Sequence, residues 1–121
     1  MAGQPAKEGE LQQFWSTFRN AVIERNWSTL EDLTNFPVLV RGELDRDPVH
    51  QVRRSEFRTV FERFLKEGVF SPGEQLKLIR STTTIQAESN SGELCRVGDM
   101  VFRKTAKGWR LSRLYMQYSL D

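Results

Sequence analysis

The sequence predicts an α+β domain with helices in its first half and an antiparallel sheet at its end. Two stretches repeat apolar residues at the spacing of one helix face, and the last third alternates apolar and polar residues between glycine-containing turns. The length of 121 residues suits one domain with its own core. We assign residues 10–121 to that domain and residues 1–9, which lack apolar periodicity, to a disordered leader.

The first two helices are predicted from an apolar stripe and a capping signal. Asn26 and Trp27 interrupt the first helix, and Ser28 with Glu31 forms a capping box for a short second helix that ends before Pro37. The stripe of the first helix, at i, i+3, i+4, i+7 and i+11, consists of Leu11, Phe14, Trp15, Phe18 and Val22.

A strand and a third helix follow. Residues 38–40 form a short β run, and the polar segment 41–49 is an excursion or a hairpin tip. The third helix is expected from Ser55 to Gly68, and three antiparallel strands over 76–88, 93–104 and 109–118. About three helices then pack on one face of the sheet and leave a cavity where helices and sheet part.

Composition and charge exclude several classes of site. The single Cys95 excludes an internal disulfide, and the single His50 excludes a multi-histidine metal site, so we expect no metal and no cofactor. The net charge of +2 and the lack of a long apolar run predict neither a nucleic-acid partner nor a membrane span. The compartment stays open between the cytoplasm and, if residues 1–9 replace a removed export signal, the periplasm.

The C-terminal hairpin has a local excess of positive charge. Between Arg96 and Arg113 six basic residues stand against Asp99 alone. This excess suits an anionic ligand or partner, and it equally suits a solvated sheet face.

The order of elements carries a resemblance to a known superfamily. The Asn26-Trp27-Ser28 break and the closing Phe102…Gly108-Trp109-Arg110-Leu111 strand pair resemble nuclear-transport-factor-two-like domains, which include ketosteroid-isomerase-like and polyketide-cyclase-like members. The resemblance covers about residues 10–118. It implies a cone-shaped, cystatin-like roll with a strongly curved antiparallel sheet, a pocket at its mouth and a homodimer through the sheet. Because members range from isomerases to adaptors, the resemblance leaves function open.

A narrower resemblance concerns the stretch Phe14-Trp15…Phe36-Pro37…Arg41-Gly42-Glu43-Leu44-Asp45. It is similar to small exported bacterial proteins of unassigned role.

The ketosteroid-isomerase-like members imply an acid–base site. Asp47 in Asp47-Pro48-Val49 resembles their general base, and Asp99 stands where they place an oxyanion donor. Their helix-one tyrosine falls at about Phe18, which has no hydroxyl, and the loss of one oxyanion donor costs ~10²–10³ in rate. Asp47 equally suits a turn, and Asp99 an ion pair with a neighbouring arginine. His50 is a second candidate base, with an exposed surface histidine as the alternative.

The aromatic residues predict a ligand pocket. Alternation along 109–118 places one set of side chains on each face of the strand. The two sets are Trp109, Leu111, Arg113, Tyr115 and Gln117, and Arg110, Ser112, Leu114, Met116 and Tyr118. Aromatic walls with one guanidinium suit a small amphipathic or anionic ligand, because arginine pairs bidentately with a carboxylate. The candidate ligand-binding residues are Phe14, Phe18, Arg80, Arg110, Tyr115 and Trp109.

The preferred prediction is therefore a non-catalytic ligand-binding or protein-interaction module with an aromatic-lined pocket. The alternative is an isomerase or dehydratase that abstracts a proton next to a carbonyl. A purely structural dimer without a pocket is the third possibility.

Overall fold

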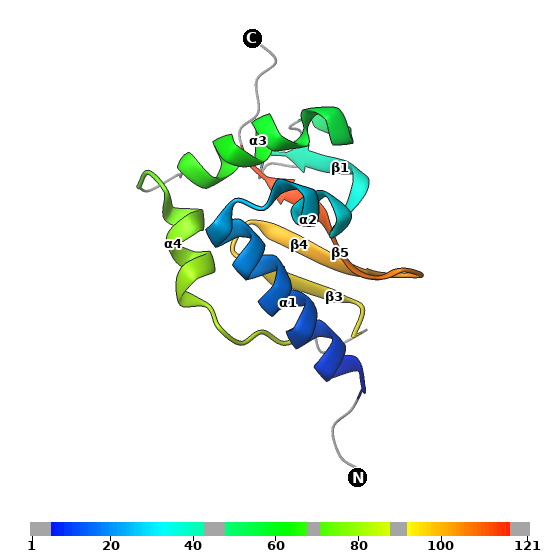
Figure 1. The fold of residues 1–121 in the computed structure, drawn as a ribbon. Coiled ribbons are helices and arrows are strands. Elements are labelled where there is room, and N and C mark those ends of the chain that lie inside the picture. Colours follow the sequence, from blue (N-terminus) through cyan, green and yellow to red (C-terminus); the bar gives the residue numbers. More distant parts are fainter. Residues whose placement is uncertain (1–5, 43–47, 68–70, 88–91, 117–121) are drawn as a thin grey trace.

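The structure is a computed structural model that describes residues 6–42, 48–67, 71–87 and 92–116. Its helices are α1 (Ala6–Glu24), α2 (Trp27–Asp32), α3 (Arg54–Lys66) and α4 (Glu74–Ser81). Its strands are β1 (Thr34–Arg41), β2 (Val49–Val52), β3 (Leu94–Val97), β4 (Met100–Thr105) and β5 (Gly108–Tyr115). Figure 1 shows the long α1 lying across the sheet, with α3 and α4 beside it.

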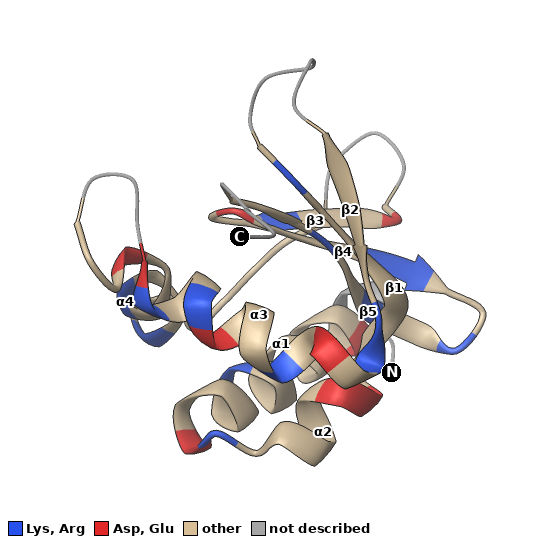
Figure 2. Ribbon diagram, turned by 90° about the horizontal axis from the view of Figure 1, so that it is seen from above, with Lys and Arg blue, Asp and Glu red and all other residues tan. Residues whose placement is uncertain are grey.

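The five strands form one open sheet in the order β2-β1-β5-β4-β3. Figure 2 shows α1, α2 and α3 gathered on one side of this sheet, which confirms the α+β class with helices packed on a sheet. The prediction of a wholly antiparallel sheet is wrong in one pair, because β1 runs parallel to β5. That pairing places β1, from the first third of the chain, beside the central strand β5.

The core lies between α1, α3 and the inner face of the sheet. Phe18 on α1 is fully buried and packs its ring 5.1 Å from that of Phe102 on β4 and 6.1 Å from that of Phe61 on α3. Trp15 and Phe57 are equally buried in the same cluster. Because each such ring removes about 150–250 Å² from water, these side chains make a large contribution to the hydrophobic stabilisation.

The predicted strand over 76–88 is wrong in its first half, which is the helix α4. This stretch is rich in Thr and Ile, which favour strands. The helix instead buries Gln75 and Ile79 on one side, at i and i+4. The backbone continues as an irregular segment through residue 87. Side chains of α1 donate the hydrogen bonds that a neighbouring strand would otherwise give to the carbonyls of this segment. Trp15 Nε1 donates to the Thr82 carbonyl at 2.8 Å, and Gln12 Nε2 donates to the Thr83 carbonyl at 2.9 Å.

The predicted strand over 93–104 is instead the tight hairpin β3–β4. Gly98 at its turn has a φ of +57°, which L-residues with side chains rarely adopt. Gln75 of α4 caps this turn, since it accepts from the Asp99 backbone N–H at 3.1 Å and donates to the Asp99 carboxylate at 3.2 Å. The Gly98-Asp99 pair is typical of a turn, but the alternating residues on both sides of it favoured one continuous strand.

The predicted faces of the last strand are also corrected. A register shift opposite Val101 and Phe102 inserts one extra residue into β5, so its alternation changes phase. Trp109 and Leu111 therefore share the buried face with Leu114, whereas Arg113 and Tyr115 lie on the opposite face.

Two smaller details differ at helix starts. The N-cap of α2 is Asn26, whose side chain accepts from the Thr29 N–H at 3.3 Å, and not Ser28. Helix α1 begins at Ala6, so residues 6–9 of the predicted leader are helical, while residues 1–5 lie outside the described part.

Candidate functional site

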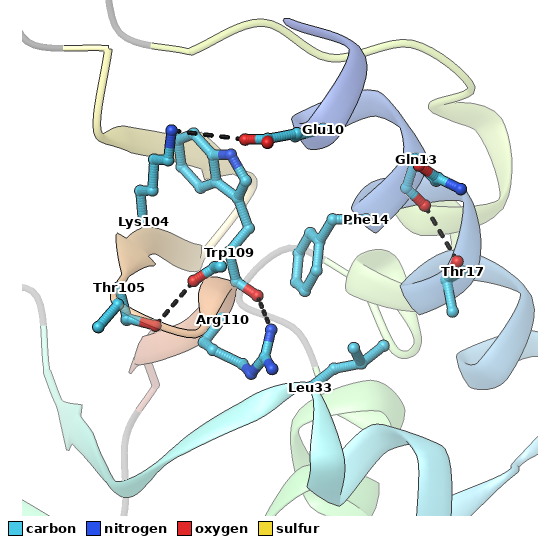
Figure 3. Close-up of a pocket in the computed structure, with 11 residues that line it drawn as sticks. Glu10, Gln13, Phe14, Thr17, Leu33, Lys104, Thr105, Trp109 and Arg110 are labelled. Carbon is cyan, nitrogen blue, oxygen red and sulfur yellow. Dashed lines mark hydrogen bonds and ion pairs between the residues drawn. The ribbon is translucent and has the colours of Figure 1, made fainter. Parts of the chain in front are cut away.

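A pocket of about 500 Å³ lies between the N-terminal half of α1 and the end of the β4–β5 hairpin (Figure 3). Its volume falls within the range of about 300–1,000 Å³ that is usual for small-molecule sites. The lining comes from α1, the end of α2 and the hairpin: Glu10, Gln13, Phe14, Thr17, Leu33, Lys104, Thr105, Ala106, Gly108, Trp109 and Arg110.

Helix α1 contributes one line of side chains to the pocket. Glu10, Gln13, Phe14 and Thr17 have the i, i+3, i+4, i+7 spacing, so they lie along the same side of the helix. Phe14 belongs to both the core and the pocket: it is 8% exposed, and its ring meets Phe102 edge-on at 5.3 Å. The apolar wall of the pocket is thus anchored in the core.

The hairpin contributes the second aromatic side chain, Trp109. It pairs with Lys104 across the two strands, beside a turn in which the Thr105 hydroxyl donates to the Gly108 carbonyl at 2.8 Å. The indole is 2% exposed, and its buried Nε1 has no hydrogen-bond partner among the described residues. Figure 3 shows this nitrogen edge turned toward α1, on the side of Glu10. A buried donor without an acceptor is unusual and unfavourable, so an acceptor supplied by a ligand would stabilise it.

The pocket carries two cations and one anion. Lys104 Nζ pairs with Glu10 Oε1 at 3.4 Å, so these two charges offset each other. The Arg110 guanidinium donates from Nη1 to the Trp109 carbonyl at 2.7 Å and forms no ion pair within the described part of the chain. Figure 3 shows it extending from β5 toward Leu33. The pocket therefore has one uncompensated positive charge, fixed in place by a backbone carbonyl.

A second pocket of about 480 Å³ adjoins the first and shares Thr105 and Arg110 with it. It is the more polar of the two, and Arg54 in its wall is paired with Asp32 at 3.6 Å. Its lining consists of Asp32, Thr34, Asn35, Phe36, Arg54, Thr105, Lys107 and Arg110. Arg110 thus stands at the junction of an aromatic pocket and a polar one.

Three of the predicted ligand-binding residues, Phe14, Trp109 and Arg110, come together in the first pocket. The other three lie elsewhere. Phe18 is fully buried in the core. Arg80 is exposed on α4, where its carbonyl accepts from the Arg19 guanidinium at 2.6 Å. Tyr115 lies on the opposite face of the sheet, beneath Arg96.

The predicted catalytic residues are not brought together in the described structure. Asp47 lies outside the described residues. His50 is on β2 and Asp99 is at the β3–β4 turn, which is three strand spacings or about 14 Å away. Both carboxylate oxygens of Asp99 are engaged, one by Gln75 at 3.2 Å and the other by Arg96 at 3.3 Å. Neither His50 nor Asp99 lines the two pockets.

The sequence prediction missed the polar part of the lining. Lys104 and Thr105 lay within the noted basic hairpin, but no pattern assigned them to a pocket. Glu10 and Gln13 share a helix side with Phe14, and this spacing was the available signal. Leu33 reaches the site only through the packing of α2 on α1.

No protein-family model matches the chain, and no curated protein matches it. Among solved structures, the chain is similar to an NTF2-like protein of unknown function from Pseudomonas putida KT2440. The two share 12% sequence identity and a TM-score of 0.47 over 99% of this chain and 93% of that one. The similarity concerns overall shape, and no residue role is transferred from it.

The described residues contain neither a membrane-spanning helix nor a metal-binding cluster. None of their helices is long and apolar enough to cross a membrane. Nor do three or more His, Cys, Asp or Glu side chains among them form a group that could hold a metal ion.

Proposed function

We propose that this chain is a non-catalytic binding module that takes a small amphipathic anion into the pocket between α1 and the β4–β5 hairpin. The observation that carries this proposal is Arg110, whose guanidinium lines the pocket without a carboxylate partner in the described part of the chain. A guanidinium without a carboxylate partner can form a new charge-assisted hydrogen bond with an incoming carboxylate, whereas a paired guanidinium would have to exchange one such bond for another. Hydrogen bonds of this kind are about twice as strong as those between neutral groups.

The aromatic wall supports a ligand with an apolar, planar body. Phe14 and Trp109 are both nine-tenths buried or more, so their positions are fixed before a ligand arrives. A fixed wall costs little conformational entropy on binding. The Trp109 Nε1–H, which has no partner among the described residues, supports an acceptor atom of the ligand at the same place.

The described lining supports binding more than proton abstraction. Glu10 is the one acidic residue of the first pocket's lining, and its carboxylate is engaged by Lys104 Nζ at 3.4 Å. An enzyme acting next to a carbonyl needs a base and an electrophilic donor within hydrogen-bond reach of one substrate.

The test is titration with 1-naphthoate and with its uncharged counterpart 1-naphthalenemethanol, followed by NMR of the tryptophan indole N–H signals. Trp15 is the internal control, because its Nε1–H is bonded to the Thr82 carbonyl. We expect naphthoate to move the Trp109 signal and leave that of Trp15 in place. Trp109→Phe assigns the signal.

The matched variants are Arg110→Gln and Arg103→Gln, since these two arginines lie opposite each other and only Arg110 lines the pocket. Arg110→Gln should weaken naphthoate binding by roughly tenfold or more, the worth of a charge-assisted hydrogen bond. Arg103→Gln should change it less than twofold. Equal binding of acid and alcohol, or equal effects of the two variants, would contradict the proposal.

A further inference from the structure

The side of the sheet away from the helices carries a regular array of side chains, here named the outer face. One row crosses four strands through the paired residues Leu39, Arg113, Val101 and Arg96. All four are partly or fully exposed, whereas the next row, Val40, Leu114, Met100 and Val97, is buried against the helices. Figure 2 shows no described helix on this side.

The outer face is positively charged because the sheet contains no acid. The sequences of all five strands include no Asp or Glu. Arg96, Arg103 and Arg113 stand on adjacent strands β3, β4 and β5, and Arg103 forms no ion pair within the described part of the chain. Asp99, at the β3–β4 turn, offsets the charge of Arg96. The net positive charge that remains attracts partners of opposite charge over about a Debye length.

Two of these arginines are held in place around Tyr115. The Arg96 guanidinium lies over the Tyr115 ring at 4.5 Å from its centroid and pairs with Asp99 at 3.3 Å. Arg113 Nη1 donates to the Tyr115 hydroxyl at 3.4 Å. Side chains that are ordered beforehand lose less entropy when a partner binds, and Arg and Tyr are the residues enriched at protein interfaces.

Apolar side chains lie between the charges. Leu39 flanks Arg113, and Val101 lies between Arg113 and Arg96 in the same row. Both are partly exposed. A partner that covered this row would therefore bury aliphatic surface together with the charges.

These observations together lead us to propose that the outer face docks an acidic protein segment with interspersed apolar residues. A second copy of this chain is a poorer occupant, because a two-fold contact would bring the arginines of one copy against those of the other. A nucleic acid also fits the outer face less well than an acidic segment does. Arg96 already covers the ring of Tyr115, the aromatic side chain in this array, so that ring is not open for base stacking.

The test uses three labelled peptides of equal length: one of alternating glutamate and leucine, one of glutamate and serine, and one of glutamine and leucine. Fluorescence anisotropy with the full chain should give the tightest binding for the glutamate–leucine peptide. The triple variant Arg96→Glu, Arg103→Glu, Arg113→Glu should weaken it by about tenfold or more at low salt. The matched control is Lys66→Glu, Lys77→Glu, Arg80→Glu, which changes the same number of exposed charges on the helices; it should change binding less than threefold.

Four results would overturn the proposal. One is an equal loss in the two triple variants, which indicates attraction to net charge alone. Another is equal binding of the leucine and serine peptides, which excludes the apolar contact. Tighter binding of a single-stranded oligonucleotide would favour a nucleic-acid surface. A dimer in sedimentation that the outer-face triple variant dissociates would favour a second copy. If the glutamate variant fails to fold by circular dichroism, the corresponding arginine-to-glutamine triple variant carries the same test.

Discussion

Arg103 on β4 lies directly opposite Arg110 on β5, so the hairpin places two like charges in one cross-strand pair. Such pairs are destabilising in antiparallel sheets. The two side chains separate: Arg103 is exposed, and Arg110 turns back to the Trp109 carbonyl at 2.7 Å, where it lines the pocket. The register of one hairpin therefore links the charge of the outer face to the cation of the proposed ligand site.

Arg103→Glu should stabilise the fold because it converts this pair into an opposite-charge pair. We expect a gain of about 0.2–1 kcal/mol in the free energy of unfolding by urea denaturation, which shrinks at high salt. The same change should weaken naphthoate binding, since the introduced carboxylate would draw the guanidinium of Arg110 away from the pocket. Lys77→Glu is the control for charge alone. A stability gain of equal size in the control would contradict the explanation.

Glu10→Gln should strengthen the binding of an anion in the pocket. The substitution removes the one acidic charge in the lining of the first pocket and releases Lys104 from its 3.4 Å ion pair. We expect the dissociation constant of naphthoate to fall by roughly three- to tenfold, with the larger effect at low salt. Stability should change by less than ~1 kcal/mol, because exposed pairs contribute little. Unchanged affinity, measured by the same NMR titration, would mean that Lys104 does not face the ligand.

The two tryptophans Trp15 and Trp109 should respond differently to replacement by phenylalanine. Both are at least 98% buried, but among the described residues only Trp15 finds an acceptor, the Thr82 carbonyl. Trp15→Phe removes volume and leaves that carbonyl without its donor, whereas Trp109→Phe removes volume and an unpartnered N–H. Urea denaturation should therefore show Trp15→Phe to be more destabilising by ~1–2 kcal/mol. Equal losses would indicate that Trp109 Nε1 has a partner in solution.

Gly98→Ala and Gly92→Ala separate backbone conformation from packing. Both glycines have positive φ, +57° and +69°, so each substitution should cost about 1–2 kcal/mol for the left-handed backbone. A Cβ on Gly92 meets nothing within 4 Å, whereas one on Gly98 would overlap Leu78 and lie 2.5 Å from Gln75 Oε1. Gly98→Ala should therefore cost a further ~1–3 kcal/mol, measured by thermal or urea unfolding. Equal costs would show that α4 does not pack on the β3–β4 turn as described.

Local patterns in the sequence determined the helices that bury a continuous apolar stripe. Leu11 to Val22 and Phe57 to Leu65 repeat at the helical period, and no other conformation places all these side chains on one side. The α+β class and three lining residues of the pocket, Phe14, Trp109 and Arg110, followed from the same reasoning.

Helix α4, the faces of β5 and the pocket were decided by contacts between residues far apart in the chain. The stretch that begins at Leu76 is rich in Thr and Ile, as strands are. Its first part is nevertheless helical, because Gln75 and Ile79 pack inward together and α1 side chains bond the carbonyls that follow. The faces of β5 depend on a register shift against β4, which no pattern within β5 reveals. The pocket likewise arises where α1 meets a hairpin about ninety residues later, and its charge balance depends on the pairing of Lys104 with Glu10. Sequence periodicity specifies which side of an element is apolar, whereas the partner that covers that side is set by the packing of the whole chain.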